Sequence, residues 1–260
     1  MSPNAYYNYK KHRKDAREKN KASTLKSIEK IYHESNGRPG YRMMQILLKN
    51  VGVNLSVQTV RKYMNVELDL KSVTRKRKYR YSKSAEAYEI SQNLIEQNFF
   101  AEHRNQKWCI DFTYIYFGKT HKRYNCTIID LYDRSVIASV NGAKINTKLA
   151  IATVEKAISR CGGIKGVVLH SDRGSQFTSK EFIEYCKSNG IKQSMSKPGY
   201  PYDNSPMERY FNTLKSELLY LYDYDDEESL YEDINCFAYG WYNCVRPHTF
   251  NGGLPPQKVK

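Results

Sequence analysis

The sequence predicts an α/β domain, in which helices flank a mixed five-stranded sheet, preceded by an all-α region containing a helix-turn-helix. Large side chains recur at every second position from Trp108 to Tyr116, which is the period of a strand. A short apolar run at residues 166–170 is typical of a buried parallel strand. Residues 1–70, by contrast, show the three- and four-residue spacing of helices.

Composition limits the class of protein. The chain has 260 residues, of which 40% are hydrophobic, enough for one large domain and a small one. No run approaches the roughly 18 to 20 apolar residues of a membrane span, and the N-terminus lacks the apolar segment of a signal peptide. We therefore expect a cytoplasmic protein with no membrane partner.

The six cysteines form no CxxC pair, so we expect neither a disulfide framework nor a zinc site. His12 and His33 could begin a His-His-Cys-Cys zinc module, but no cysteine precedes Cys109.

The positive charge is concentrated in the first third of the chain. Residues 1–83 contain 21 Lys and Arg against 6 Asp and Glu, whereas residues 84–260 contain 21 of each kind. The whole net charge of +15 therefore lies before residue 84. This division favours an N-terminal region that neutralises nucleic-acid phosphates. A solvated basic tail and attraction to an acidic membrane surface are the alternatives.

Residues 1–70 are predicted to form a helical DNA-binding region. One helix is expected over residues 22–34 and a second from about Tyr41 to Asn50. After a turn, Ser56 can cap a third helix, which carries Arg61 and Lys62 as candidate DNA contacts. The same pattern occurs in three-helix bundles of any function.

Residues 71–104 are predicted to be a basic linker and a helix. Residues 71–83 contain seven Lys and Arg and no acid. They form either a flexible linker or a segment that lies along a DNA backbone. The absence of acids favours the second interpretation, with these candidate contacts: Arg75, Lys76, Arg77, Lys78 and Arg80.

Residues 105–260 are predicted to be the larger domain. Strands are expected from Trp108 and over residues 123–131, 134–141, 166–170 and 191–195; helices are expected over residues 147–161, 178–188, 206–221 and 226–243. Three strands in a meander, followed by helix, strand, helix, strand and helix, are the element order of a ribonuclease-H-like fold.

Three carboxylates on separate elements are the candidate catalytic and metal-binding residues. Asp111 interrupts an aromatic strand, where a carboxylate is costly to bury without a partner. Asp172 directly follows the buried strand, at the carboxyl end where α/β folds place ligands. Glu208 lies in the first turn of the 206–221 helix, on the same face as Asn212 and Lys215. The neighbouring stripe, predicted to be core, comprises Met207, Phe211, Leu214, Leu218 and Leu221.

This set of residues suits Mg²⁺, which prefers carboxylate oxygens and leaves room for water and phosphate. Two such ions about 3.5–4 Å apart can activate an attacking oxygen and stabilise a departing one. The spacing of Asp172 and Glu208 is not specific by itself, because chance gives roughly one such Asp–Glu pair in this composition.

The sequence around these carboxylates resembles the OrfB-type transposases of insertion-sequence family three, which have an integrase core and belong to the DDE superfamily. The blocks that carry the resemblance are residues 108–115 (WCIDFTYI), 170–179 (HSDRGSQFTS), 202–215 (YDNSPMERYFNTLK), 241–243 (WYN), 246–248 (RPH) and 255–256 (PP). Residues 40–42 (GYR) and 60–64 (VRKYM) resemble the upstream helix-turn-helix of the family.

The resemblance implies metal-dependent cleavage of DNA at the ends of an insertion sequence, followed by strand transfer. Asp111 and Asp172 would bridge two Mg²⁺ ions, for which Mn²⁺ can substitute, and Glu208 would complete the second site. Lys215, in the basic position that follows the family's glutamate, would contact DNA with Asn212.

The implied partners are terminal inverted repeats, target DNA, further copies of the chain as a homo-oligomer on DNA, and an OrfA product or OrfA fusion in a bacterial nucleoid. A metal-dependent nuclease that does not join strands is one alternative. A non-catalytic DNA-binding regulator is another, although the intact carboxylate set argues against it.

Other polar residues have structural interpretations. We expect His170 to be a hydrogen-bonded structural residue rather than a base. Asp130 and Asp133 are expected to cap a turn, and Asp203 and Asn204 to shape the loop that leads into the Glu208 helix.

Overall fold

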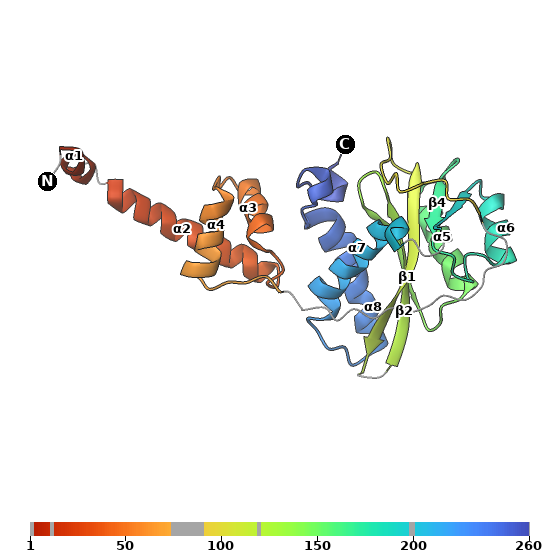
Figure 1. Cartoon of the computed structure of the whole chain (residues 1–260). Coiled ribbons are helices and arrows are strands. Elements are labelled where there is room, and N and C mark those ends of the chain that lie inside the picture. The colour runs from red at the N-terminus through yellow and green to blue at the C-terminus, as the bar shows by residue number, and fades with distance from the viewer. Residues whose placement is uncertain (1–2, 11–12, 74–90, 119–120, 198–200, 260) are drawn as a thin grey trace. The chain divides into compact units, whose positions relative to one another are not determined.

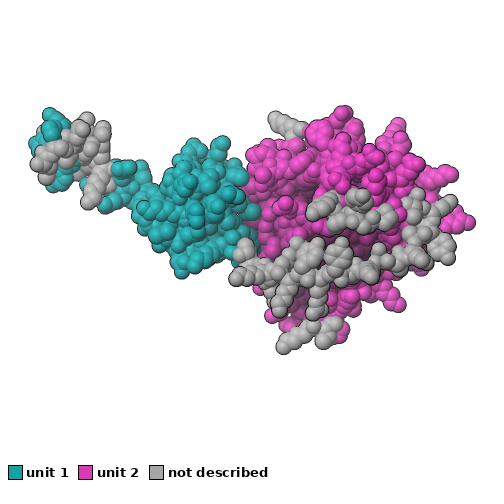
Figure 2. Space-filling view, in the orientation of Figure 1, with its two compact units in different colours: residues 1–74 teal, residues 75–260 magenta. Residues whose placement is uncertain are grey.

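The computed structural model describes residues 3–10, 13–73, 91–118, 121–197 and 201–259. The chain divides into two compact units, residues 1–74 and 75–260 (Figure 2). Each unit has its own hydrophobic core.

The N-terminal unit is helical, as predicted. Its helices are α1 (Pro3–Lys10), α2 (Arg13–Glu34), α3 (Tyr41–Asn50) and α4 (Val57–Lys62). The last of these, α4, continues into a π-helical turn, Tyr63–Glu67. The predicted cap is confirmed, because the Ser56 hydroxyl accepts a 3.1 Å hydrogen bond from the Thr59 N–H. The core consists of Ile28, Met44, Leu48, Val60 and Met64.

The start of α2 differs from the prediction. The helix begins at Arg13 rather than at residue 22. Its first part is mostly charged and exposed, so it has no apolar stripe from which periodicity could be recognised.

The predicted linker and helix over residues 71–104 are described only in part. Residues 74–90, which include Arg75, Lys76, Arg77, Lys78 and Arg80, lie outside the described residues. The described stretch 91–104 contains turns and no helix.

The second unit contains a mixed five-stranded sheet, in the order β3-β2-β1-β4-β5. The strands β1 (Lys107–Phe117), β2 (His121–Asp130) and β3 (Val136–Gly142) form the predicted antiparallel meander. The short strands β4 (Val168–Ser171) and β5 (Lys192–Met195) join it in parallel, with β4 beside β1. The arrangement is the predicted ribonuclease-H-like fold.

Helices cover both faces of this sheet (Figure 1). On one face lie α5 (Thr147–Cys161) and α6 (Lys180–Ser188), packed on a core that includes Trp108, Ile110 and Phe177. On the other lie α7 (Ser205–Leu214) and α8 (Glu227–Asn235), over a core that includes Cys109, Ile115 and Tyr210. Side chains of β1 therefore enter both cores in alternation, and the strand is fixed from both sides.

Both C-terminal helices end in π-helical segments, Lys215–Leu219 after α7 and Cys236–Val245 after α8. The predicted stripe Met207, Phe211, Leu214 and Leu218 is buried. Leu221 lies beyond the end of this helix and is only half-buried, so its assignment to the core stripe was wrong.

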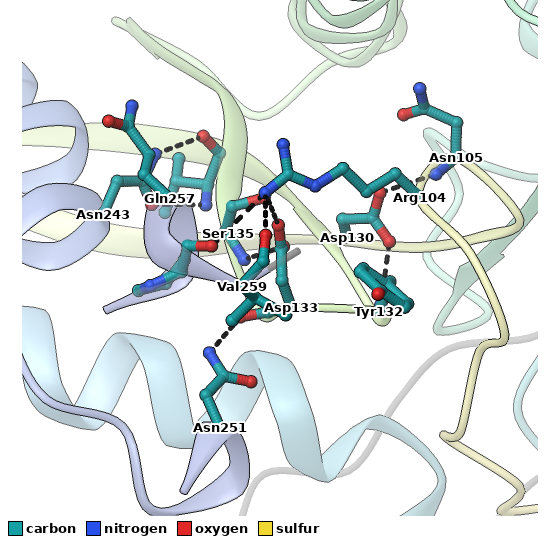
Figure 3. Close-up of polar contacts among 12 residues, drawn as sticks. Arg104, Asn105, Asp130, Tyr132, Asp133, Ser135, Asn243, Asn251, Gln257 and Val259 are labelled. Carbon is teal, nitrogen blue, oxygen red and sulfur yellow. Dashed lines mark hydrogen bonds and ion pairs between the residues drawn. The ribbon is translucent and has the colours of Figure 1, made fainter. Parts of the chain in front are cut away.

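The turn between β2 and β3 is held by the two predicted capping aspartates (Figure 3). Asp130 accepts hydrogen bonds from the N–H groups of Asn105 and Tyr132, at 2.7 and 2.8 Å. Asp133 accepts one from the Ser135 N–H, at 2.8 Å, and forms a 3.0 Å ion pair with Arg104. The turn is thereby tied to the segment that precedes β1.

All six cysteines are free. Within the described residues, no helix combines the length and the apolar character that crossing a membrane requires.

Candidate active site

The register of two parallel strands brings the two aspartates together. Cys109 of β1 lies opposite His170 of β4. Asp111 lies two residues after Cys109 on β1. Asp172 lies two residues after His170, directly after the end of β4 at Ser171. Because adjacent strands are about 4.8 Å apart, this register sets Asp172 beside Asp111.

Asp111 is held by two hydrogen bonds. Its Oδ1 accepts from the Phe112 N–H at 2.7 Å, and its Oδ2 accepts from the Asn204 amide at 3.0 Å. Burial raises the pKa of Asp111 well above its ordinary value, and the negative charges of Asp172 and Glu208 raise it further. The two electrostatic contributions indicate that the three predicted carboxylates converge on one region.

Asp172 occupies a tight turn at the end of β4. Its Oδ1 accepts a 2.9 Å hydrogen bond from the Gly174 N–H. A side chain at residue 174 would meet the end of the Gln176 side chain, which would have to move aside. Burial also raises the pKa of Asp172. The side chain nonetheless remains open to solvent, so we expect this shift to be smaller than that of Asp111.

Glu208 approaches the aspartates from the first turn of α7 and is exposed. The buried stripe of α7 fixes the rotation of the helix, which leaves Glu208, Asn212 and Lys215 on the adjacent face. The Lys215 charge lowers the pKa of Asp111, so this lysine also lies near the carboxylates.

These side chains are chemically suited to a hard cation. Carboxylate and amide oxygens are the ligands that Mg²⁺ accepts. Next to Asp111, Asn204 adds a buried Oδ1 that has no hydrogen-bond partner within the described part of the chain. The electrostatic repulsion at Asp111 is of the kind that a cation relieves. Among the described side chains, no three of His, Cys, Asp or Glu are already close enough to share one ion.

The contact of Asn204 with Asp111 was not predicted. The sequence indicated only that Asp203 and Asn204 shape the loop, and Asp203 does so by accepting from the Asn93 amide and the Lys197 N–H. Asn204 stands at the N-cap of α7, yet its side chain does not cap the helix. An asparagine at an N-cap normally does. No sequence signal shows that its amide turns to Asp111 instead.

His170 has the structural role that was expected. It is fully buried, with Nδ1 2.8 Å from the Ser194 hydroxyl and Nε2 3.2 Å from the Ser196 hydroxyl. These contacts connect β4 to β5 and the loop that follows, and burial lowers the pKa of His170.

The predicted DNA contacts of the N-terminal unit lie on its surface. Arg61 and Lys62 are exposed in the last turn of α4. Arg61 also lies over the Tyr41 ring, at 5.8 Å from its centroid. The helix α4 therefore presents cations to solvent, while Val60 packs inward.

Different protein families match the N-terminal unit and the second unit. Residues 18–78 match the HTH-like domain family. Residues 101–201 and 189–256 match two families that are each described as integrase core domain. The fold is also similar to a chain of the intasome of simian T-cell lymphotropic virus bound to PP2A regulatory subunit B56 gamma. That likeness has a TM-score of 0.53 at 19% identity and covers 89% of this chain and 73% of the other.

Two curated relatives are transposases. The putative transposase InsK for insertion sequence element IS150 of Escherichia coli K12 is 31% identical over 235 residues, 90% of this chain and 82% of that protein. The transposase for insertion sequence element IS904 of Lactococcus lactis is 28% identical over 239 residues, 92% of this chain and 94% of that protein.

An integrase core joined to an HTH-like domain defines a DNA-binding polynucleotidyl transferase of the DDE superfamily. The chain belongs to the IS3 family of insertion-sequence transposases, whose function is DNA transposition.

Proposed function

We propose that this transposase cleaves DNA at the ends of its insertion sequence and joins the freed ends to a second strand, with Asp111, Asp172 and Glu208 as the catalytic carboxylates. The observation that carries the proposal is the β1–β4 register, which sets Asp172 beside Asp111 at the end of the sheet. The position of Glu208 in the first turn of α7 supports it, because its charge acts on Asp111.

The carboxylates would hold two Mg²⁺ ions, which would activate the attacking oxygen and stabilise the departing one. Asp111, Asp172 and Glu208 are the residues that would hold the ions. Asn204 orients Asp111 through its 3.0 Å hydrogen bond. Mn²⁺ would substitute for Mg²⁺, since it accepts the same oxygen ligands.

The reaction consists of two displacements at phosphorus. In the first, the oxygen of water bonds to the phosphorus at the element end, and the bond to the 3′ oxygen of the element breaks. The products are a 3′-hydroxyl on the element and a 5′-phosphate on the flanking DNA. In the second, that 3′-hydroxyl attacks a phosphodiester of the second strand, whose own 3′ oxygen departs. Asn212 and Lys215 would contact the DNA near the element end.

The basic N-terminal region would supply most of the affinity for DNA. We assign Arg61 and Lys62 to contacts made by the helix-turn-helix. We assign phosphate contacts to the cations of the basic segment, Arg75, Lys76, Arg77, Lys78 and Arg80. The protein would act at the bacterial nucleoid as a homo-oligomer on DNA, alone or with an OrfA product.

A strand-transfer assay with labelled element ends tests the proposal. Purified protein, end DNA and a target plasmid are incubated with Mg²⁺, with Mn²⁺ or with EDTA. We expect cleaved and joined products with either metal and neither product in EDTA. Cleavage without joining would identify a metal-dependent nuclease. Binding of the ends with neither reaction, including with an OrfA product added, would identify a regulator.

A further inference from the structure

A pocket of about 510 Å³ lies beside the start of α7. The described residues that line it all belong to the second unit, and none of these is acidic. The lining includes Arg134, Ser205, Arg209, Arg246, His248 and Phe250. The pocket has the size of a small-ligand site.

Arg134 lines this pocket and has one guanidinium nitrogen that makes no hydrogen bond to any described residue. Its Nη2 donates to the Phe99 carbonyl at 3.0 Å, and its guanidinium lies 4.0 Å from the centroid of the Phe250 ring. Its buried Nη1 has no hydrogen-bond partner among the residues that the structure describes. The nearby carboxylates of Asp130 and Asp133 are engaged by backbone N–H groups and by Arg104. A buried N–H of a charged group without an acceptor is costly, so an incoming anion would be stabilised there.

Two further features add positive potential. Arg209 is exposed on α7, and no carboxylate in the described part of the chain forms an ion pair with it. The first turn of α7 has no side-chain cap, because Asn204 is bonded to Asp111. Ser205, in that turn, lines the pocket. The dipole of α7 attracts anions to this end of the helix, although Pro206 in the same turn contributes no N–H.

The remaining basic residues of the pocket do not add an available charge. Arg246 is paired with Glu217, with Nη2 donating to Oε1 at 2.8 Å and Nε to Oε2 at 3.0 Å. Burial, followed by the Arg246 charge, lowers the pKa of His248 to about 4, so this ring is neutral at pH 7. The anion site is therefore formed by Arg134, Arg209 and the start of α7.

We propose that this pocket binds a backbone phosphate of the DNA strand held at the catalytic carboxylates. Glu208 lies between Ser205 and Arg209 on the first turns of α7, where each residue advances about 1.5 Å. A strand at Glu208 therefore runs within reach of the pocket. The inference rests on the proposed function, since it assumes that DNA lies at these carboxylates.

Binding in EDTA tests the pocket separately from catalysis. The affinity of the full chain for a fluorescent duplex of the element end is measured over a range of salt concentrations. We expect Arg209→Gln to weaken binding about tenfold and to reduce the slope of log K against log salt by about 0.9. Arg160→Gln is the matched control, because Arg160 is exposed on α5 and lines no part of the pocket. It should change neither value.

Methylphosphonate substitution then locates the phosphate. Each phosphate of the duplex is replaced in turn by an uncharged methylphosphonate. Substitution at one of these phosphates should weaken DNA binding by the wild type but not by Arg209→Gln. The Arg134→Lys variant should bind unmodified DNA more weakly, although its melting temperature should stay within a few degrees of that of the wild type. If no position distinguishes Arg209→Gln from the wild type, the proposal is wrong.

A free anion is the competing ligand. Two results together would show that the pocket binds free phosphate, and the proposal would then fail. Sodium phosphate at matched ionic strength would raise the melting temperature of the wild type but not of Arg209→Gln. The salt slopes of DNA binding would be the same for the two proteins. If the methylphosphonate pattern holds but Mg²⁺ supports neither cleavage nor joining, the proposed function fails instead.

Discussion

The Asn204 amide donates a 3.0 Å hydrogen bond to Oδ2 of Asp111, although the two residues are 93 positions apart in the sequence. Because the Asn204 side chain is used in this way, it leaves the start of α7 without a side-chain cap. A cap is worth about 1 kcal/mol, so the positioning of Asp111 comes at some expense of local helix stability. This exchange is expected where side chains serve a site rather than the fold.

Replacing Asn204 by Ala tests this role. We expect strand transfer to fall about 10- to 100-fold, the usual effect of removing a partner of a metal ligand. Stability should change by only about 1 kcal/mol, since a single hydrogen bond is lost. The control is Asn251→Ala, which removes a 2.7 Å hydrogen bond to the Asp133 carbonyl away from the site. Equal loss of strand transfer in both variants would refute a specific role for Asn204.

Glu208→Gln keeps the shape of the side chain and removes one negative charge. Glu208 is exposed, so we expect normal folding and normal binding of element ends. Cleavage and joining should fall by at least about 100-fold, since even an outer partner of a metal ligand has effects approaching that size. Labelled ends report both reactions. If the variant joined ends at a near wild-type rate, Glu208 would not be part of the metal site.

The unequal distribution of charge gives a third prediction. Deleting residues 1–83 removes the whole net charge of +15. DNA affinity should fall, and its dependence on salt should flatten, because fewer counterions are released. The second unit keeps both of its cores and should melt cooperatively. An unchanged affinity and salt slope would show that DNA binds elsewhere.

The sequence was sufficient to predict the elements that have a clear period. Three elements, β1, β4 and α7, each bury a defined face. Their apolar residues therefore recur with a regular period, or in one short run, that can be recognised in the sequence. The order of strands and helices then placed the carboxylates on neighbouring elements. Charged elements such as the first part of α2 carry no such period, because little of their surface is buried.

Contacts between distant segments could not be predicted. The hydrogen bond of Asn204 to Asp111, and the meeting of Arg134 and Arg209 at one pocket, depend on how α7 packs across the sheet. Arg134 adopts a left-handed backbone conformation (φ 64°) in the β2–β3 turn, and nothing in its residue type indicates it. Such features follow from tertiary packing rather than from local sequence.

His248 should make stability depend on pH. Its pKa is lowered to about 4 by burial, against about 6.5 in the unfolded chain. The unfolded state therefore binds a proton first, and stability is lost as the pH falls from about 6.5 to about 4. Urea unfolding at both pH values should show a loss of up to about 3 kcal/mol from this residue. His248→Gln should lose less across this range, whereas Asn251→Ala should keep the wild-type difference. Identical pH dependence in all three proteins would contradict the assignment.

The carboxylates should make the opposite contribution. The pKa of Asp111 is raised by burial and by the charges of Asp172 and Glu208. A raised pKa means that the folded state binds the proton more tightly, so this stabilisation is complete below about pH 4. It is lost as the pH rises through the folded pKa. At neutral pH without metal, the ionised site therefore destabilises the fold.

A divalent ion should relieve that repulsion, and melting in Mn²⁺ and in EDTA measures the effect without DNA. Binding only to the folded state stabilises it by about 1.4 kcal/mol at ten times Kd. We expect millimolar Mn²⁺ to raise the melting temperature of the wild type slightly, because phosphate oxygens are missing from the coordination shell. Asp111→Asn and Asp172→Asn should lack this rise and should melt higher than the wild type in EDTA. Asp133→Asn is the matched control: Asp133 pairs with Arg104 outside the site, so this variant should melt lower and keep the full rise. If the two site variants behaved like this control, the carboxylates would not form a metal site.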